Sequence, residues 1–568
     1  MRFLRMLTNA LLAGALGAAY LTILLLQLNP QIPLASHSVW RWYLTLAGFY
    51  GAHLALLFYV LMLLREFVSV AAFSPGWVSV RLLAWLSASA AAVAAALMWL
   101  NLRDFPAVLD EAAARRFAFG AGATTASAVV LLGIAIAHYS SRRRGSRVGA
   151  VLLILAITGS LALPIAARGG GGAPPLGTRR VVLAAPPARE TPRVIVLLLD
   201  GASLEYVWPR VAAARLPNFG RVLDSGASMN LATIRPTQPD PVWAAVATGM
   251  YPAKNGVRSA ASYYAPGDDR GVDLLPSHCF SHVLVRLGVV RDRPNSSSAW
   301  RARPLWTILG DYGISAGIVR WPLTYPAQAL TGFMVSDRFH QLVGSMFEFD
   351  GRVAYPPDIV PIARDAFAAI PASPADAVTA AARRDEAYSR AARALASSRP
   401  VAVEAVRYQG IDAASHVFLR FAQPGGFGDV SDADRQQYGP ILDRYYAYVD
   451  GEIGAAIDRL TPGDLLLVVS AFGMQPVGPL AHAAGRLLRD PEVSGTHENA
   501  PDGFLLAYGA TVTPGRKPRG SIVDVTPTIL YFLGLPIGRD MDGFARADLF
   551  NEPFTAARPI TFIPSHGR

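Results

Sequence analysis

The stretch Arg193-Val-Ile-Val-Leu-Leu-Leu-Asp200-Gly201 decides the fold of the larger part of this chain. Its apolar run is too short to cross a bilayer. An unbroken Val/Ile/Leu run is typical of a parallel strand that is covered on both faces. Ligands bind at the carboxyl ends of the strands in open α/β sheets, so we expect Asp200 to lie at a functional rim. The alternative is that Asp200 only caps the following helix.

Strand-like and helix-like segments alternate after Asp200. They cover residues 317–322, the Ala-rich stretch 375–397, and residues 401–407, 465–470 and 503–508. Such alternation predicts an α/β domain with a largely parallel central sheet, which we place at residues 192–568.

Five long apolar segments occupy the first third of the chain. They cover residues 3–28, 40–64, 82–100, 117–138 and 148–167. Each reaches the length of about 20 residues that crosses the hydrocarbon core. The first is longer than the apolar core of a signal peptide, so we expect an uncleaved helix. The sequence therefore predicts a five-helix transmembrane region at residues 1–167, with the lipid bilayer as a partner.

Arginines near the ends of these segments predict the orientation. Arg2 and Arg5 precede the first segment, and four more separate the fourth from the fifth: Arg142, Arg143, Arg144 and Arg147. With five spans they all lie on one side, which the positive-inside rule identifies as the cytoplasm. We therefore expect a multi-pass plasma (inner) membrane protein. A Gly/Pro-rich linker at residues 168–191 would lead to a periplasmic or extracellular domain.

The net charge of +11 does not indicate nucleic-acid binding. Nearly all of the 52 basic residues are arginines, with Lys254 and Lys517 the only lysines, and they are scattered along the chain. The single cysteine, Cys279, excludes an internal disulfide. His278-Cys279-Phe-Ser-His282 offers three metal-binding side chains, but no fourth ligand is near in sequence.

Two further segments carry the residue types of a metal site. In Tyr408-Gln-Gly-Ile-Asp412-Ala-Ala-Ser-His416, Asp412 and His416 are four residues apart and would share one face of a helix. His497 follows in the small-residue loop Ser494-Gly-Thr-His497. Each histidine alone is more typical of a structural or exposed position. Together, two histidines and one carboxylate are a standard ligand set for catalytic zinc, with a fourth position for water or substrate.

These motifs belong to an ordered series that extends to about residue 550. The series is Leu199-Asp200-Gly201, Leu216-Pro-Asn-Phe219, Ala247-Thr-Gly-Met-Tyr-Pro252 with Asn255-Gly-Val, Trp321-Pro-Leu-Thr-Tyr-Pro326, Asp412-x3-His416, Gly495-Thr-His497, and Asp524-Val-Thr-Pro-Thr-Ile-Leu through Asp540-Met-Asp-Gly543. In this order it resembles the type I phosphodiesterase/nucleotide pyrophosphatase branch of the alkaline phosphatase superfamily. The sulfatase branch is not expected, because Cys279 lacks the Pro-x-Arg setting that formylglycine formation needs.

The resemblance implies two metal ions and a Thr or Ser nucleophile that attacks a phosphate ester. It assigns Asp412, His416 and His497 to one complete metal site and Asp200 to the other. The second site should also contain an Asp-His pair, but the corresponding positions hold Ala471 and Phe472, which have no donor atoms. Because a divalent ion needs three or four protein ligands, we expect one zinc ion and a lost second site.

The nucleophile position is altered as well. In Arg235-Pro-Thr-Gln-Pro-Asp-Pro-Val-Trp243, an ungapped comparison places Pro239 where the resemblance implies Thr or Ser. Thr237 is the candidate catalytic residue if the backbone shifts locally, and Asp240 is the other neighbour. The alternatives are a turn role for Thr237 and a capping role for Asp240 at a helix that starts near residue 241.

Three functions follow from these expectations. The first is a membrane-anchored, metal-dependent hydrolase of phosphate esters or phosphodiesters that acts on an envelope or lipid-linked substrate with one zinc ion. The second is a pseudoenzyme that keeps the fold and one metal site to bind a phosphorylated ligand or a partner protein. In the third, the membrane helices are primary and the outer domain serves assembly. The three retained ligands favour the first two.

Overall fold

The computed structural model describes residues 1–68, 77–139, 147–171, 192–278, 281–342, 352–368, 377–423, 430–478, 482–483 and 494–567. Arg142, Arg143 and Arg144, Cys279 and most of the predicted linker lie outside these ranges. The chain divides into two compact units. Unit 1 comprises Met1–Pro175 and Ala261–Pro294, and unit 2 comprises Leu176–Ala260 and Asn295–Arg568.

Unit 1 contains the apolar helices that the hydropathy pattern predicts. Among the described residues, five are long and apolar enough to cross a membrane: α1 (Arg2–Leu28), the segment His37–Glu66, α4 (Val80–Asp104), α5 (Glu111–Tyr139) and α6 (Arg147–Arg168). The segment His37–Glu66 is built from α2 (His37–Leu46), a π-helical turn (Ala47–Gly51) and most of α3 (Ala52–Val68). The prediction of five apolar helices is confirmed.

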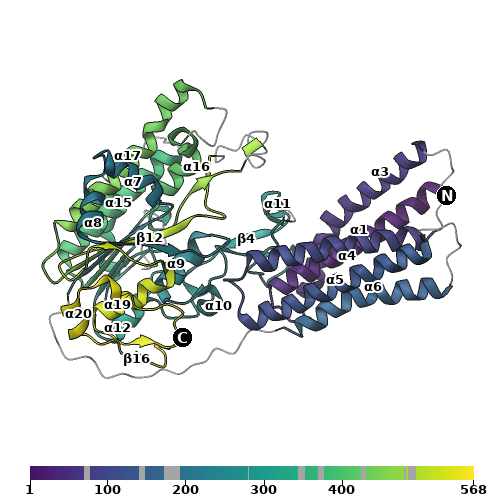
Figure 1. The fold of residues 1–568 in the computed structure, drawn as a ribbon, viewed down its shortest axis with the longest axis horizontal. Coiled ribbons are helices and arrows are strands. Elements are labelled where there is room, and N and C mark those ends of the chain that lie inside the picture. The colour runs from purple at the N-terminus through teal and green to yellow at the C-terminus, as the bar shows by residue number, and fades with distance from the viewer. Residues whose placement is uncertain are drawn as a thin grey trace. The chain divides into compact units, whose positions relative to one another are not determined.

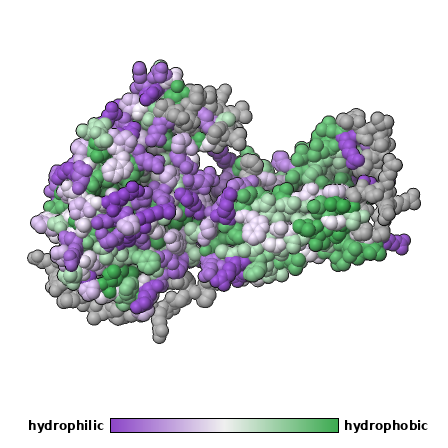
Figure 2. Space-filling model, viewed as in Figure 1, coloured by the Kyte–Doolittle hydropathy of each residue, from purple (hydrophilic) through white to green (hydrophobic). Residues whose placement is uncertain are grey.

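The outer surface of these helices is apolar. Ile154 and Leu155 of α6 are each 63% exposed, and Leu56 of α3 is 61% exposed. Figure 2 shows hydrophobic residues gathered over the helices of unit 1, whereas hydrophilic residues predominate over much of unit 2. An exposed apolar surface of this extent is typical of contact with lipid.

Unit 1 also contains a segment from the middle of the chain, residues 261–294. It forms an antiparallel pair of strands, β3 (Ala261–Tyr264) and β4 (Arg291–Pro294), and the short helix α11 (Ser281–Arg286). The side-chain amide of Asn29, just after α1, donates to the Leu274 carbonyl at 2.7 Å. The Asn101 amide oxygen, near the end of α4, accepts from the Ser277 N–H at 2.7 Å. These bonds attach the segment to the ends of α1 and α4 that are distant from the N-terminus.

Unit 2 is built on a mixed sheet, in which ten strands are described. Their order is β13-β2-β12-β9-β1-β8-β5-β6-β7, with β14 paired to β2. The strands are β1 (Val194–Leu199), β2 (Ala227–Ala232), β5 (Ala316–Val319), β6 (Gly332–Val335), β7 (Ala354–Tyr355), β8 (Val403–Tyr408), β9 (Leu465–Phe472), β12 (Asp502–Tyr508), β13 (Gly515–Arg516) and β14 (Gly520–Ser521).

The centre of this sheet is parallel, as the sequence predicts. β9, β1, β8, β5 and β6 are parallel neighbours, whereas β12 is antiparallel to both β9 and β2. All six residues of β1 are buried, because helices cover both faces of the sheet. Leu199 at the end of β1 is paired with Tyr408 of β8 and Ser470 of β9. The carboxyl ends of three central strands therefore meet at one edge.

Two layers of helices enclose the sheet of unit 2 (Figure 1). One layer contains α7 (Leu204–Ala212), α8 (Pro217–Ser225), α14 (Val360–Ala368), α15 (Ala377–Ser398), α16 (Gly410–Ala422) and α17 (Asp432–Ile457). The other contains α9 (Pro239–Thr248), α12 (Leu305–Asp311) and α19 (Val525–Phe532). The first layer packs its apolar face on Ile195, Leu197 and Leu199, the alternate residues of β1.

Unit 2 also contains shorter elements. They include α10 (Pro252–Asn255), α13 (Phe339–Leu342), α20 (Glu552–Ala557), the two-residue pairs β10 (Gln475–Pro476) with β11 (Gly495–Thr496), and β15 (Ile537–Gly538) with β16 (Phe562–Ile563). Of these, β11 matters for the site, because it leads directly to His497.

Candidate functional site

Asp412, His416 and His497 converge at the carboxyl edge of the sheet. Each offers one ligand atom, and these atoms lie within 4.8 Å of one another. The Asp412 Oδ2 atom lies 3.7 Å from His416 Nε2, and Asp412 Oδ1 lies 3.8 Å from His497 Nε2. Asp412 and His416 are on one face of α16, as their spacing predicts. The structure therefore brings together the three residues that the sequence assigns to one metal site.

Both imidazole rings are fixed through their other nitrogen. His416 Nδ1 lies 2.9 Å from the Gly495 carbonyl oxygen, and His497 Nδ1 lies 3.1 Å from the Thr237 carbonyl oxygen. A ring that donates from Nδ1 to a carbonyl keeps Nε2 as an acceptor, which is the usual state of a metal-binding histidine. Both Nε2 atoms then face Asp412.

The carboxylate of Asp412 also fits a cation. Its Oδ1 atom is buried and accepts no hydrogen bond from the described residues. Burial raises the pKa of Asp412, and this shift is opposed by His497 and His416. A buried anionic oxygen without a donor is costly, and a bound cation would relieve that cost. The donor set and its surroundings therefore suit one divalent ion, with nitrogen and oxygen ligands that zinc accepts.

The loop that carries His497 is held directly on α16. The Ser494 N–H donates to the His416 carbonyl at 3.0 Å, and the Ser494 hydroxyl accepts from the Arg420 N–H at 2.5 Å. Gly495 is needed for this approach, because a Cβ atom there would lie 2.6 Å from the Ser415 carbonyl oxygen. The histidines meet because the loop packs on the helix, although they are far apart in sequence.

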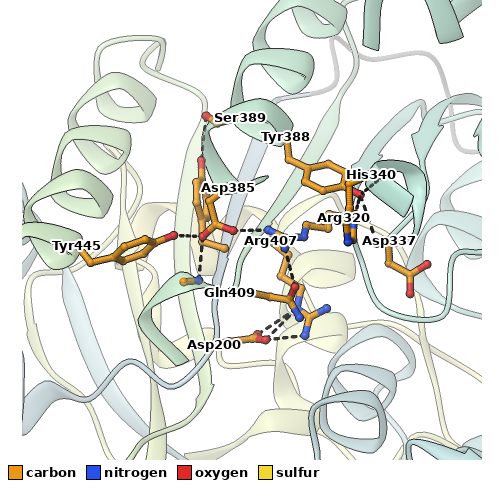
Figure 3. Close-up of polar contacts among 12 residues, drawn as sticks. Asp200, Arg320, Asp337, His340, Asp385, Tyr388, Ser389, Arg407, Gln409 and Tyr445 are labelled. Atoms are coloured by element: carbon orange, nitrogen blue, oxygen red, sulfur yellow. Dashed lines mark hydrogen bonds and ion pairs between the residues drawn. The ribbon is translucent and has the colours of Figure 1, made fainter. Parts of the chain in front are cut away.

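A buried polar network positions the start of α16 (Figure 3). Asp385 of α15 accepts from the Gly410 N–H at 2.9 Å, and it is paired with Arg320. Arg320 in turn donates to the Gln409 side chain at 2.7 Å. The Arg320 and Asp385 side chains are 1% and 0% exposed. The network fixes the backbone two residues before Asp412.

Asp200 does not join the three ligands but is held by other side chains. The Arg407 Nε atom lies 3.1 Å from each carboxylate oxygen of Asp200, and Arg407 Nη2 donates to Oδ2 at 2.5 Å. The indole N–H of Trp243 donates to Oδ1 at 2.7 Å. Asp200 is 1% exposed and Arg407 is 4% exposed. The carboxylate that the resemblance assigns to a second metal thus has a buried guanidinium as its partner.

The other positions of this second half-site are apolar. Ala471 and Phe472 are buried at the end of β9. The Phe472 ring packs against the His497 ring, with 5.2 Å between their centroids. The phenyl ring therefore covers one side of His497, a potential metal ligand, and contributes no ligand of its own.

Thr237 supports the first site through its backbone. Its carbonyl faces His497, and its N–H donates to the Glu498 carbonyl at 2.9 Å. Its hydroxyl is buried and donates to the Ile234 carbonyl at 2.8 Å. This is the geometry of a turn residue, the alternative role that the sequence leaves open.

Pro239 is the first residue of α9, which begins two residues earlier than the predicted start near 241. Asp240 consequently lies in the first helical turn and does not cap the helix. Burial raises the pKa of Asp240 to about 7, with Arg407 opposing the shift and Asp337 and Asp200 adding to it. This carboxyl group can exchange a proton near neutral pH.

Sequence reasoning missed Arg407, Trp243, Arg320 and Asp385. Arg407 had a signal, since it interrupts an otherwise largely apolar strand whose six residues are all buried. A charged residue at such a position needs a partner. The other three give no local signal, because their partners come from distant segments.

A second group of potential ligands lies in unit 1. It consists of His37, Asp268 and Asp269, and the His37 and Asp269 side chains are 60% and 83% exposed. His278 lies 2.5 Å from Asp104, so it has a carboxylate partner within unit 1. Cys279, the central residue of the His-Cys-Phe-Ser-His stretch, is outside the described residues.

Comparison with known proteins identifies a family for this chain. A family model for type I phosphodiesterase / nucleotide pyrophosphatase matches residues 194–501. No curated protein sequence matches the chain. Similar solved structures include murine ectonucleotide pyrophosphatase / phosphodiesterase 5, with 13% identity and a TM-score of 0.38, and the human protein of the same name, with 13% identity and a TM-score of 0.37. Each alignment covers 63% of this chain and 100% of the other. The family match spans more than half of this chain. The chain therefore belongs to the type I phosphodiesterase / nucleotide pyrophosphatase family.

Proposed function

We propose that the protein is a membrane-anchored phosphodiesterase-type hydrolase that uses one zinc ion. The observation that carries the proposal is the convergence of Asp412, His416 and His497, with both Nε2 atoms directed at the carboxylate. When bound, zinc supplies Lewis acidity and favours deprotonation of water near neutral pH. Three protein ligands leave a position for water or substrate.

The residues around the ligands would support this chemistry in distinct ways. The Gly495 and Thr237 carbonyls orient the two imidazoles. Phe472 excludes water from one side of His497. Asp240, with a pKa of about 7, can hold or accept a proton at the neighbouring half-site.

Binding without turnover is the second candidate function, and a specific observation favours it. The Thr237 hydroxyl already donates to the Ile234 carbonyl, and Asp200 is engaged by Arg407 and Trp243. The groups that the family resemblance associates with nucleophilic attack are therefore used structurally. A pseudoenzyme of this kind would use the same metal site to recognise a phosphorylated ligand or a partner protein.

Metal content and turnover of the full-length protein in detergent separate these candidates. The hydrolase proposal expects one equivalent of zinc and turnover of bis-p-nitrophenyl phosphate, both lost in His497→Ala. The matched control is His37→Ala, which removes a histidine of the second ligand group and should keep both. Zinc binding without turnover would support the pseudoenzyme. Zinc that persists undiminished in His497→Ala would contradict both candidates.

We also place unit 2 outside the cytoplasm and propose a lipid-linked or envelope substrate. The described arginines Arg2 and Arg147 begin α1 and α6, and residues 261–294 are attached at the opposite ends of α1 and α4. Unit 1 contains a cavity of about 500 Å³ whose walls are mostly apolar, with Tyr20 and His53 among its few polar residues. A long-chain phosphodiester with a photoactivatable tail should crosslink to α1 or α4. Equal labelling by a neutral lipid with the same tail would refute that substrate class.

A further inference from the structure

We infer that Arg407 is a built-in cation that occupies the place of a second metal ion, so that Asp200 is its ion-pair partner and not a metal ligand. The inference rests on the proposed function in one respect, namely that Asp412, His416 and His497 form the metal site. It concerns the neighbouring half-site, whose residues do not fit an ion.

The contacts of Asp200 leave little capacity for a metal. Its Oδ1 atom accepts from Trp243 at 2.7 Å and from Arg407 Nε at 3.1 Å. Its Oδ2 atom accepts from Arg407 Nε at 3.1 Å and from Nη2 at 2.5 Å. An ionised carboxylate has about four lone-pair sites. Three N–H groups make these contacts, because the single Nε hydrogen is shared between the two oxygens, and together they use most of the accepting capacity of the carboxylate.

The residues around Asp200 cannot complete a coordination shell. Ala471 and Phe472 stand where the resemblance implies an Asp-His pair, and Pro239 stands where it implies a nucleophile. A catalytic or structural zinc ion takes three or four protein ligands. Among the described residues, Asp200 belongs to no group of three potential ligands whose donor atoms lie within 4.8 Å of one another, and its carboxylate is already engaged.

Strand pairing brings Arg407 beside this carboxylate, because β8 is the parallel neighbour of β1. Arg407 is the penultimate residue of β8 and is paired with Leu198 of β1, and Asp200 directly follows the last residue of β1. A guanidinium is planar and permanently charged, and its fork matches the two oxygens of a carboxylate. Removal of Asp200 from water would be costly without such a partner. The guanidinium thus supplies locally the positive charge that an ion would otherwise contribute.

Two further carboxyl groups, those of Asp240 and Asp337, lie near Arg407, and Arg338 is a second arginine that acts on both. Burial raises the pKa of Asp240 to about 7 and raises the pKa of Asp337, and Arg407 and Arg338 oppose both shifts.

Zinc stoichiometry tests the inference. Full-length protein in detergent would be equilibrated with zinc, and bound metal would be counted in the wild type, in Ala471→Asp/Phe472→His, and in that pair combined with Arg407→Ala. We expect one equivalent in the wild type and one in the restored pair, because Arg407 still occupies the half-site. We expect two when Arg407 is also removed, and one when Arg407→Lys replaces Arg407→Ala, because the charge is kept. Two equivalents in the restored pair alone would overturn the inference.

A conservative variant keeps the test valid if the multiple substitutions fail to fold. Asp200→Asn preserves shape, and it should keep one equivalent of zinc with unchanged affinity, whereas His416→Ala should lose the ion. Loss of zinc from Asp200→Asn to the same degree as from His416→Ala would show that Asp200 is a ligand and overturn the inference. A wild-type protein without zinc would instead refute the proposed function. Two equivalents in the wild type would refute the role of Arg407, so the two failures are distinguishable.

Discussion

Arg407 and Asp200 form a buried ion pair, and this predicts an asymmetric response to mutation. Arg407→Met leaves a buried carboxylate without a counter-charge, which we expect to lower the free energy of unfolding by about 3–5 kcal/mol. Arg407→Met/Asp200→Leu removes both charges and should cost much less. Chemical denaturation in detergent measures both.

The matched control is Arg390→Met. Its partner Glu386 is on the same helix, and the two side chains are 42% and 43% exposed. An exposed pair of this kind contributes about 0.3–0.5 kcal/mol. A loss in Arg407→Met no larger than in this control would show that the buried pair is not a stabilising feature.

His340 makes the stability of unit 2 sensitive to acid. Burial, with Arg320 and Arg384 adding to the effect, lowers the pKa of His340 from 6.5 to about 3. Between these values the unfolded chain binds a proton that the folded chain does not. The contribution of neutral His340 is therefore complete above pH 6.5 and is lost as the pH falls toward 3, by at most about 1.4 kcal/mol per pH unit.

The variant His340→Gln isolates this effect. The free energy of unfolding would be measured near pH 7.5 and near pH 5 for the variant and the wild type. We expect the wild type to lose more stability than the variant between the two conditions. An equal loss in both would show that His340 is not the titrating group.

At the scale of elements, the close packing of α16 on α17 sets the position of Asp412. A Cβ atom at Gly410 would lie 2.0 Å from Tyr445, so Gly410→Ala must displace the tyrosine or the helix start. We expect a loss of about 1–3 kcal/mol from overpacking. Zinc affinity should fall as well, by about 10–100-fold, which is typical when the support of a ligand is disturbed.

Gly451→Ala provides the matched control for this change. Gly451 lies in α17, and a Cβ atom there would meet nothing within 4 Å. The substitution should leave zinc affinity unchanged and, through helix propensity, stabilise α17 by up to about 1 kcal/mol. Competition with a chelator measures affinity, and equal affinity in both glycine variants would contradict the positioning role of α16.

At the scale of the whole molecule, five apolar helices predict that the two ends of the chain lie on opposite sides of the membrane. A reporter that is active only in the cytoplasm should be silent when fused to the C-terminus. The same reporter fused after Tyr139, the end of α5, should be active because four spans precede it. Strong activity of the C-terminal fusion would refute the proposed topology.

Much of the architecture could be predicted from the sequence because its signals are local. The apolar lengths of the first five spans, the strand before Asp200 and the four-residue spacing of Asp412 and His416 each depend on neighbouring residues. The missing donors at Ala471 and Phe472 are likewise visible in the sequence alone. These features follow from hydrophobic periodicity and residue chemistry, and both depend only on residues that are close together in the sequence.

The partners of these residues were decided only by the tertiary structure. Arg407 reaches Asp200 across 207 positions of sequence, because β8 is placed beside β1 in the sheet. Thr237 orients His497 with its carbonyl, a group that every residue has and that no sequence pattern marks. Residues 261–294 join unit 1, where their backbone forms hydrogen bonds with the side-chain amides of Asn29 and Asn101. Local spacing in the sequence was enough to identify the candidate metal ligands. Strand order and loop packing depend on contacts between distant segments, so only the folded chain determined that Arg407 is the partner of Asp200 and that the Thr237 carbonyl faces His497.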